Sequence, residues 1–150
     1  MKEVLEGVYP FTTEGKAQMI KGLMDDNCVM HSLLVCDFQG KFIPLNTEEF
    51  GEYFNAVTGL DFSASDLYER TDIIETLIRQ INIREGLIAE DDRLPRRILE
   101  ESLPEGPPKG RVIGHENFIK MKREYYLLRG WDAQGVPTRE TISKYKYDGE

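Results

Sequence analysis

The side chains in this chain that could act as nucleophiles or metal ligands are few and widely spaced. Cys28, Cys36 and His31 lie in the apolar stretch 28–38, and the second histidine is His115. A zinc site needs more Cys or His ligands at short spacing than this stretch provides. Two interpretations therefore stand: both cysteines are small buried apolar side chains, or Cys36 is a cluster thiolate whose partner ligands lie elsewhere.

Other residues that could bind ligands have equally good structural explanations. The acidic run Glu90–Asp92 could hold a hard cation, but it also fits an exposed turn that pairs with neighbouring arginines. Trp131, beside Asp132, could form a ligand platform or could anchor a core or an interface. The chain contains no Gly-x-Ser-x-Gly, phosphate-binding loop, GxGxxG or HExxH motif. The residues alone therefore predict no self-contained active site.

Composition and charge limit the classes of partner. The 150 residues are 40% hydrophobic and 31% charged, which is typical of one globular domain with an adequate core. The formal net charge of -8 argues against binding to nucleic acid or to an anionic membrane surface, because both need basic patches. The apolar runs are too short to span a bilayer, and no signal-peptide pattern opens the chain. With two cysteines and no disulfide framework, we expect a cytoplasmic location.

Hydrophobic periodicity predicts an all-α fold: a single irregular helical domain with long ordered loops. Residues 1–11 form a lead-in, and residues 12–148 form the domain. The expected helices are 13–25, a segment from Asn46 to Gly59, 65–85, a segment from Glu116 to Gly130, and a short last helix capped by Thr138.

The longest predicted helix, 65–85, is expected to be the scaffold against which the other helices pack. Ser63 or Ser65 caps its start. Its solvated face includes Glu75 and Arg79, which are spaced for an i, i+4 ion pair. Its apolar stripe consists of Leu67, Ile74, Leu77, Ile78 and Ile81.

Three other segments have distinctive composition. Thr12–Thr13 offers N-caps for the first helix, and Asp25–Asn27 ends that helix or gives it a polar break. The stretch 28–38 is apolar on all sides, so we predict that it is buried. Residues 87–115 exceed an ordinary loop in length, but they carry apolar side chains. We therefore predict an ordered strap over the core, with one helical turn at 95–101.

Three motifs occur in order in the second half of the chain. They are NIREG at 82–86, DDRLPRR at 91–97 and YYLLRGWD at 125–132, followed by Gly135, Pro137 and Thr138. Their order and spacing resemble the C-terminal domain of the tungsten-containing aldehyde ferredoxin oxidoreductases, over about residues 9–147. We expect structural roles for the most distinctive motif residues, which fix the strap and the C-terminal corner.

The resemblance implies an activity and its cofactors. In that family, an N-terminal β domain cradles the cofactor and two helical domains follow. Tungsten, sometimes molybdenum, is held by two pterin dithiolenes, and a nearby 4Fe–4S cluster passes electrons to ferredoxin. Three cluster cysteines come from the middle domain, and the fourth comes from an Asp-x-x-Gly-Leu-Cys type motif in the C-terminal domain that also contacts one pterin. The whole enzyme oxidises an aldehyde to a carboxylic acid.

That motif aligns with residues 31–37 of this chain. Cys36 matches the family's cysteine and is the implied fourth cluster ligand. His31 stands where the family has aspartate, and a neutral imidazole offers at most one acceptor to pterin N–H groups. Leu34 stands at the family's glycine, where close approach of a ligand becomes harder. The implied pterin-contacting residues are His31, Leu34, Val35 and Asp37.

The chain lacks the β domain, the Cys-x-x-Cys-x-x-x-Cys motif and the first pterin motif. One thiolate cannot hold a 4Fe–4S cluster, which needs four ligands. We therefore expect an excised domain, a split subunit or a truncated gene product, inactive and without cofactor when alone. Its partners would be the missing N-terminal and middle domains and ferredoxin, and we expect the isolated chain to self-associate because removing those domains exposes apolar surface. The alternative is a non-catalytic stand-alone helical interaction domain, in which the apolar stretch 28–38 serves a partner or self-association.

Overall fold

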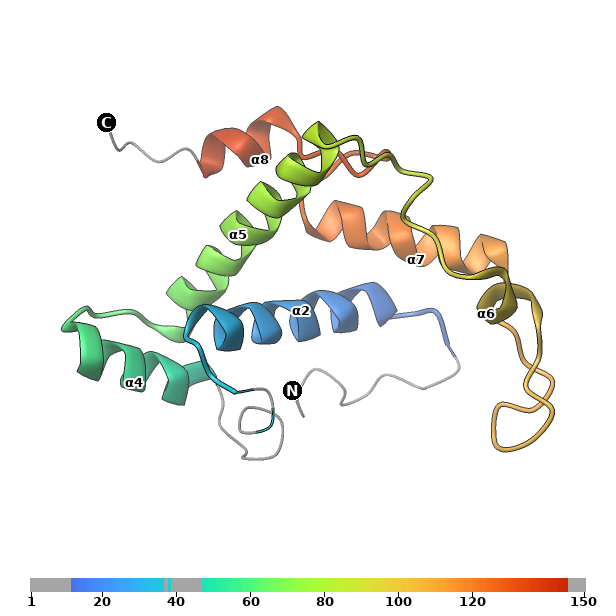
Figure 1. Cartoon of the computed structure of the whole chain (residues 1–150), viewed down its shortest axis with the longest axis horizontal. Coiled ribbons are helices and arrows are strands. Elements are labelled where there is room, and N and C mark those ends of the chain that lie inside the picture. Colours follow the sequence, from blue (N-terminus) through green and yellow to red (C-terminus); the bar gives the residue numbers. More distant parts are fainter. Residues whose placement is uncertain (1–11, 37, 39–46, 146–150) are drawn as a thin grey trace.

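The computed structural model describes residues 12–36, 38 and 47–145. In that part of the chain, the only extended pairing is a single bridge between Trp131 and Pro137. None of the described helices is both long enough and apolar enough to cross a bilayer. The helices are α2 (Lys16–Ser32), α4 (Thr47–Thr58), α5 (Ala64–Arg84), α6 (Arg96–Glu100), α7 (His115–Leu128) and α8 (Arg139–Lys144) (Figure 1). The predicted all-α class with long loops is confirmed.

Several predicted helix ends are confirmed by their caps. Ser63 caps α5 in a capping box, in which its hydroxyl accepts from the Asp66 N–H and the Asp66 carboxylate accepts from the Ser63 N–H. Thr138 caps α8 by accepting from the Thr141 N–H. The predicted helical turn in the strap is α6. The predicted lead-in 1–11 and the predicted cap of α4 lie outside the described residues.

The central scaffold is α2, not α5 as the sequence predicted. Both α5 and α7 pack against α2, and α4 packs against the start of α5 and the end of α2 (Figure 1). In the second half of α5, the apolar Leu77, Ile78 and Ile81 are 51%, 46% and 48% exposed. Thr76 and Arg79, on the opposite side of the helix, are buried. The apolar stripe therefore faces away from the core of this chain over the second half of α5.

α2 is longer than predicted because its polar residues have distant partners. The helix continues through Asp25 and Asp26 to Ser32, and both carboxylates are buried. Asp25 accepts hydrogen bonds from Arg129 Nη1 at 2.6 Å and from Lys21 Nζ at 2.7 Å. The arginine lies just beyond α7, so its pairing to α2 is a tertiary contact. α2 begins after Gly15 without a side-chain cap, contrary to the predicted threonine cap.

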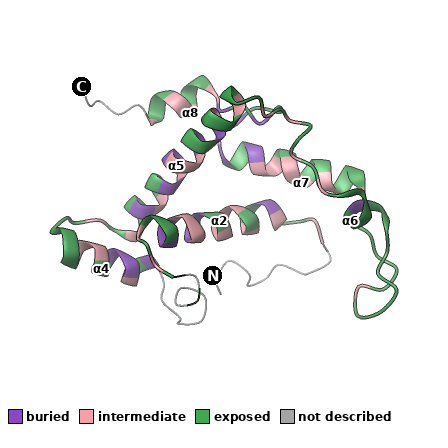
Figure 2. Ribbon diagram, viewed as in Figure 1, coloured by how far each residue is buried: buried purple, intermediate pink, exposed green. Residues whose placement is uncertain are grey.

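The apolar core lies where the end of α2 meets α4 and the start of α5. It is formed by Val29 and Met30 from α2, Phe50 from α4 and Leu67 from α5. Figure 2 shows buried stretches of these three helices where they meet. Leu33, Val35 and Phe62 pack against it. Because Val29 and Met30 belong to this core, it packs the last turn of α2 against α4 and α5.

α2 ends in a Schellman motif centred on Leu34. The Val35 N–H donates to the Met30 carbonyl at 2.9 Å, and the Leu34 N–H donates to the His31 carbonyl at 3.1 Å. Leu34 has φ +58° and is the only non-glycine with positive φ in the described part of the chain. Its side chain is 92% exposed. The strain of this left-handed residue is therefore not offset by burial.

The prediction that the whole stretch 28–38 is buried is wrong. Val29 and Met30 are buried, but His31 and Ser32 are exposed on the last turn of α2, and after the chain reverses Leu34 and Cys36 are exposed as well. The Schellman motif is the cause, because it ends the helix at the surface while returning Val35 to the core. The exposed residues in the stretch are His31, Ser32, Leu34, Cys36 and Phe38.

A buried polar cluster joins the strap to α5 and α7. Arg79 Nη1 and Nη2 donate to the two carboxylate oxygens of Asp92 at 3.1 and 2.6 Å. Arg79 Nε donates to the Gly135 carbonyl at 2.7 Å, and the Tyr126 hydroxyl donates to Asp92 Oδ2. The sequence predicted that Arg79 faces solvent, but this side chain is buried against the strap. The carboxylate of Asp92 is occupied by these donors, which argues against the cation site considered for 90–92.

We expect Leu34→Gly to raise the free energy of unfolding by about 0.5 to 1 kcal/mol, because glycine adopts positive φ without strain. Part of the relief is offset by the greater freedom of glycine in the unfolded chain. Urea unfolding monitored by circular dichroism measures the change. Leu34→Ala keeps the strained Cβ and should give no gain. A Gly variant less stable than the Ala variant would contradict the proposed strain.

We expect Asp92→Asn to lower the free energy of unfolding by about 3 kcal/mol at pH 7, because it leaves buried Arg79 without its charge partner. Burial opposes ionisation of Asp92, but its bonds from Arg79 and Tyr126 dominate and lower its pKa. A carboxyl with a lowered folded pKa stabilises the fold above its unfolded pKa and loses that contribution as the pH falls through the folded pKa.

The difference between wild type and Asp92→Asn should therefore shrink below about pH 4. Denaturant unfolding at pH 7 and at pH 3 measures both effects. Asp91→Asn is the matched control, because the exposed Asp91 carboxylate accepts from the Ile88 N–H, a bond that an amide oxygen also makes. If both variants lowered the free energy of unfolding equally at pH 7, the Asp92–Arg79 pair would not be the source of the loss.

Candidate functional site

The candidate site is the segment 33–36, which we call the Cys36 loop. It follows the last turn of α2 directly. Val35 packs against the core, while Leu34 and Cys36 on either side of it are exposed. The loop is therefore anchored at Val35 and presents the two neighbours of that residue to the surface. Asp37, also predicted for this site, lies outside the described residues.

The two cysteines occupy different environments. Cys28 is half-buried on α2, whereas Cys36 is exposed. Burial raises the pKa of the Cys28 thiol, and the charge of Glu75 raises it further, against a lowering hydrogen bond with Ser32. A thiol with a raised pKa stays protonated at neutral pH and is a poor metal ligand. Of the two interpretations from the sequence, the buried apolar thiol fits Cys28, and accessibility to an outside partner fits Cys36.

The Cys36 loop offers one candidate metal ligand. In the described part of the chain, no three His, Cys, Asp or Glu side chains converge to hold a metal ion. His31 is exposed on the last turn of α2, before the loop. The donor set fits one corner of a cluster shared with another domain, and it does not fit a site enclosed by this chain.

The backbone at Leu34 has the shape that a glycine would take. Its φ of +58° lies in the left-handed region, where glycine is the usual residue. The resemblance described above places the family's glycine at this position. The Leu34 side chain, however, is exposed where a ligand would approach the loop. The backbone at Leu34 therefore suits a glycine, whereas the leucine side chain adds bulk at the surface of the loop.

A buried ion cluster fixes α2 one turn before Cys28. The Arg129 side chain is 1% exposed, and its Nη1 lies 2.6 Å from Asp25 and 2.9 Å from Asp72. Lys21 Nζ completes the cluster at 2.9 Å from Asp72. The cluster joins three helices: Arg129 caps the end of α7, Asp72 belongs to α5, and Asp25 and Lys21 belong to α2. Its role is to position α2, and hence the Cys36 loop, on the other helices.

Several motif residues of the second half make structural contacts, as expected for Asp92 and Asp132. Asp92 of DDRLPRR bonds Arg79, and Tyr126 and Arg129 of YYLLRGWD take part in the two buried clusters. The Asp132 carboxylate accepts from the N–H groups of Gln134 and Val136, each at 2.9 Å, and closes the turn after Trp131. Sequence reasoning found neither the buried clusters nor the partners of these residues, because no spacing rule pairs positions so far apart in the chain.

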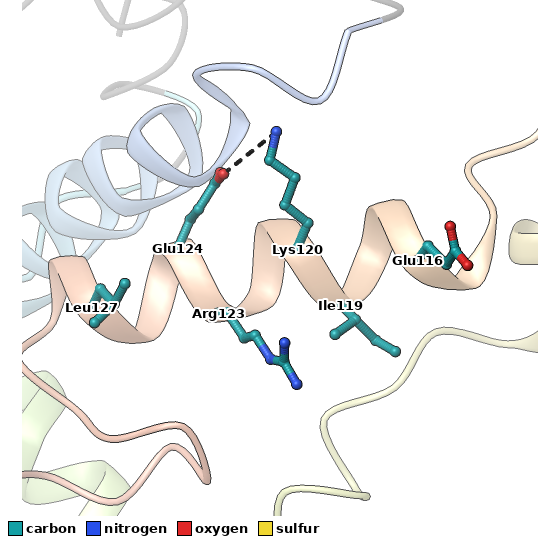
Figure 3. A pocket seen from close by; sticks show the side chains of 6 residues that line it. All are labelled: Glu116, Ile119, Lys120, Arg123, Glu124 and Leu127. Atoms are coloured by element: carbon teal, nitrogen blue, oxygen red, sulfur yellow. Dashed lines mark ion pairs between the residues drawn. The ribbon is translucent and has the colours of Figure 1, made fainter.

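The described surface is hollowed beside α7. A shallow hollow of about 380 Å³ runs along one face of α7 and is lined by that helix alone, with Lys120 and Glu124 paired across it at 3.8 Å (Figure 3). A much larger cleft of about 1630 Å³ is bounded by α2, α5, α7 and the strap. Neither contains Cys36.

Residues 2–146 match the family model for aldehyde ferredoxin oxidoreductase, domains 2 and 3. The chain is 33% identical over 129 residues to the tungsten-containing aldehyde ferredoxin oxidoreductase of Thermococcus kodakarensis. It is 32% identical over 133 residues to the enzyme of the same name from Pyrococcus furiosus. The alignments cover 85% and 88% of this chain, but 20% and 21% of the relatives. The chain thus spans about one fifth of the length of these relatives.

The fold also matches a solved structure, the active site complex BamBC of benzoyl coenzyme A reductase with 1,5-dienoyl-CoA. The TM-score is 0.72 and the identity 21%, over 93% of this chain and 20% of that chain. Such a low identity shows the fold alone. The family model and the relatives, which agree over most of the sequence, show that this chain belongs to the aldehyde ferredoxin oxidoreductase family and corresponds to its C-terminal domain.

Proposed function

We propose that this chain is the C-terminal part of an enzyme that oxidises an aldehyde to a carboxylic acid. The overall reaction consumes one water and releases two protons and two electrons, which leave singly for ferredoxin. The observation that supports this role is the exposed Cys36 thiol beside the anchored end of α2, in a chain of this family. The chain supplies one ligand and one side of a pocket, so it is not active alone.

Cys36 would bind one iron of a 4Fe–4S cluster as a thiolate, with the other three cysteines supplied by the middle domain. The cluster, when bound, supplies one-electron transfer between the pterin-bound tungsten, or molybdenum in its place, and ferredoxin. Cys36 suits this role because its side chain is exposed one residue after the core-anchored Val35. The anchored backbone limits how far the thiol can move, which favours a fixed ligand geometry.

The same loop would contact one pterin, mainly through backbone groups. The Val35 side chain packs against the core, so only its backbone can face a ligand. His31 would offer one imidazole nitrogen in place of the family's carboxylate. Leu34 would border the pterin with its exposed side chain, and Asp37 is the remaining candidate. The N-terminal and middle domains would supply the rest of the pocket.

The second candidate function is a non-catalytic helical interaction domain. One observation favours it: the Leu34 side chain is 92% exposed at the position where the family's glycine leaves room for the pterin. His31 and Leu34 would then mark a loop that has lost its cofactor. Under this candidate, substitution of Cys36 would change neither iron content nor assembly.

We expect Cys36→Ser to reduce bound iron roughly tenfold when the chain is purified anaerobically from its host in its native assembly, because a neutral hydroxyl replaces a thiolate ligand. Iron analysis and electron paramagnetic resonance of the reduced protein measure the loss. Cys28→Ser is the matched control and should keep its iron, because Cys28 lies half-buried on α2. Equal iron in wild type and Cys36→Ser would favour the non-catalytic domain.

We expect His31→Asp combined with Leu34→Gly to increase retained tungsten or molybdenum roughly tenfold in the same assembly. The aspartate carboxylate would accept hydrogen bonds from pterin N–H groups, and the glycine would remove the leucine side chain from the surface of the loop. Metal analysis after extended dialysis measures the gain against a His31→Asn control, which adds no charge. Lower retention than in wild type would contradict a pterin contact at these residues.

A further inference from the structure

The buried ion cluster is balanced in charge, and a further carboxyl stands beside it. Arg129 Nη1 contacts the carboxylates of Asp25 and Asp72 at 2.6 and 2.9 Å. Lys21 Nζ contacts the same two carboxylates at 2.7 and 2.9 Å. Two bases therefore face two acids, and their formal charges cancel. Glu75 lies on α5 about one turn after Asp72 and is half-buried, so its ionisation adds a negative charge that the cluster does not balance.

The Glu75 carboxylate does not share the hydrogen bonds of this cluster. Within the described residues, the Arg129 Nη2 has no acceptor, and its Nε donates to the Tyr125 hydroxyl at 3.0 Å. The ion pair that the sequence predicted between Glu75 and Arg79 is also not formed among these residues, because Arg79 is bonded to Asp92 instead. The charge of Glu75 is therefore offset only at a distance.

These surroundings make Glu75 a weaker acid than an ordinary glutamate. Burial raises the pKa of its carboxyl, and the positive charge of Arg129 opposes that rise. The negative charges of Asp25 and Asp72 raise the pKa further, and Lys21 opposes them more weakly. A carboxyl with a raised pKa exchanges its proton closer to neutral pH than an exposed one does. Glu75 is thus suited to gain and lose a proton while the enzyme works.

One side of Glu75 is open and the other faces groups that stay neutral. The residue lines the large cleft, through which a proton can reach it. On α2, burial and then the charge of Glu75 raise the pKa of the Cys28 thiol. On α7, burial raises the pKa of the Tyr125 hydroxyl, with Arg129 opposing and Glu75 adding to the rise. Neither group competes for the proton at neutral pH, and Asp92 of the strap is bonded to Arg79.

Glu75 lies within electrostatic reach of the Cys36 loop. Its charge acts on Cys28, and the Val35 N–H bonds the carbonyl of Met30, two residues after Cys28. Steps of 3.8 Å and a helical rise of 1.5 Å per residue then bring Cys36 to within about 15 Å of Cys28. At an effective dielectric constant of about 20, a unit charge at about 15 Å changes a proton affinity roughly fivefold to tenfold. A change of charge beside Cys36 is therefore felt at Glu75.

We propose that Glu75 is a redox-linked proton site for the cluster that Cys36 would bind. Its carboxylate takes up one proton from the cleft as one electron reaches the cluster from the oxidised aldehyde. The carboxyl returns that proton to the cleft as the electron passes on to ferredoxin, so charge balances at each step. The inference rests on the proposed function. It assigns a role to a carboxyl that weakens the fold when ionised.

The test is the midpoint potential of the cluster in the native assembly as a function of pH, by redox titration with electron paramagnetic resonance. At low pH Glu75 holds its proton in both redox states, and at high pH in neither, so the potential falls only between these limits. A fivefold to tenfold change in proton affinity gives a total fall of about 40 to 60 mV for one electron. We expect that fall in the wild type between about pH 4 and about pH 9.

Three variants assign the proton to Glu75. Glu75→Gln keeps the shape but cannot ionise, so the fall should disappear. Glu75→Asp keeps a carboxyl and should keep the fall. Glu124→Gln is the matched control on the outer face of α7 and should behave as the wild type (Figure 3). Circular dichroism verifies that each variant folds.

Infrared difference spectra give a second readout. Reduction of the cluster should add the C=O band of a protonated carboxyl and remove a carboxylate band, and Glu75→Gln should abolish both changes. The wild type without any fall in potential, a Glu75→Gln variant that keeps the fall, or the same infrared changes in that variant would each overturn the proposal. With iron bound, these results leave the proposed function standing. A wild-type assembly without a cluster would reject both.

Discussion

The ion cluster of Arg129 with Asp25 and Asp72 is the constraint on which the arrangement of this domain depends. A guanidinium that is 1% exposed requires carboxylates within hydrogen-bonding distance, and it finds one on α2 and one on α5. Replacing such a cluster as a whole by apolar side chains can be neutral, but removing one member leaves a buried charge unpaired. The cluster therefore fixes which turn of α2 faces α5 and α7, more than it adds net stability.

The Cys36 loop depends on that placement. α2 is held by Asp25 in its middle and by Val29 and Met30 in the core near its end. The Schellman motif then reverses the chain within a few residues, returns Val35 to the core and leaves Cys36 exposed. If Cys36 serves as the proposed cluster ligand, its backbone must be held in place while its thiol stays accessible from outside the domain. The end of an anchored helix meets both requirements.

Much of the remaining surface has the character of an interface. The second half of α5 exposes its apolar residues and buries Thr76 and Arg79, and the cleft collects further aliphatic side chains around a tryptophan with an unpaired donor. Exposing apolar side chains while burying polar ones is unfavourable for a chain that functions alone, because the exposed apolar surface gains no hydrophobic free energy of burial. It becomes favourable if other domains cover these surfaces, as expected for a chain about one fifth as long as its relatives.

The sequence by itself determined the helical class, most helix limits, the family, and Cys36 as the residue to examine. These follow from local patterns: the Ser63 and Thr138 caps, the apolar periodicity and the ordered motifs. Only the tertiary structure decided that α2 is the scaffold, that Arg79 and Asp25 are buried, and that Leu34 is left-handed. Partners such as Asp25 and Arg129 are 104 residues apart, and no local pattern pairs them. Burial and ion pairing are decided by which surfaces meet, and that is a property of the folded chain.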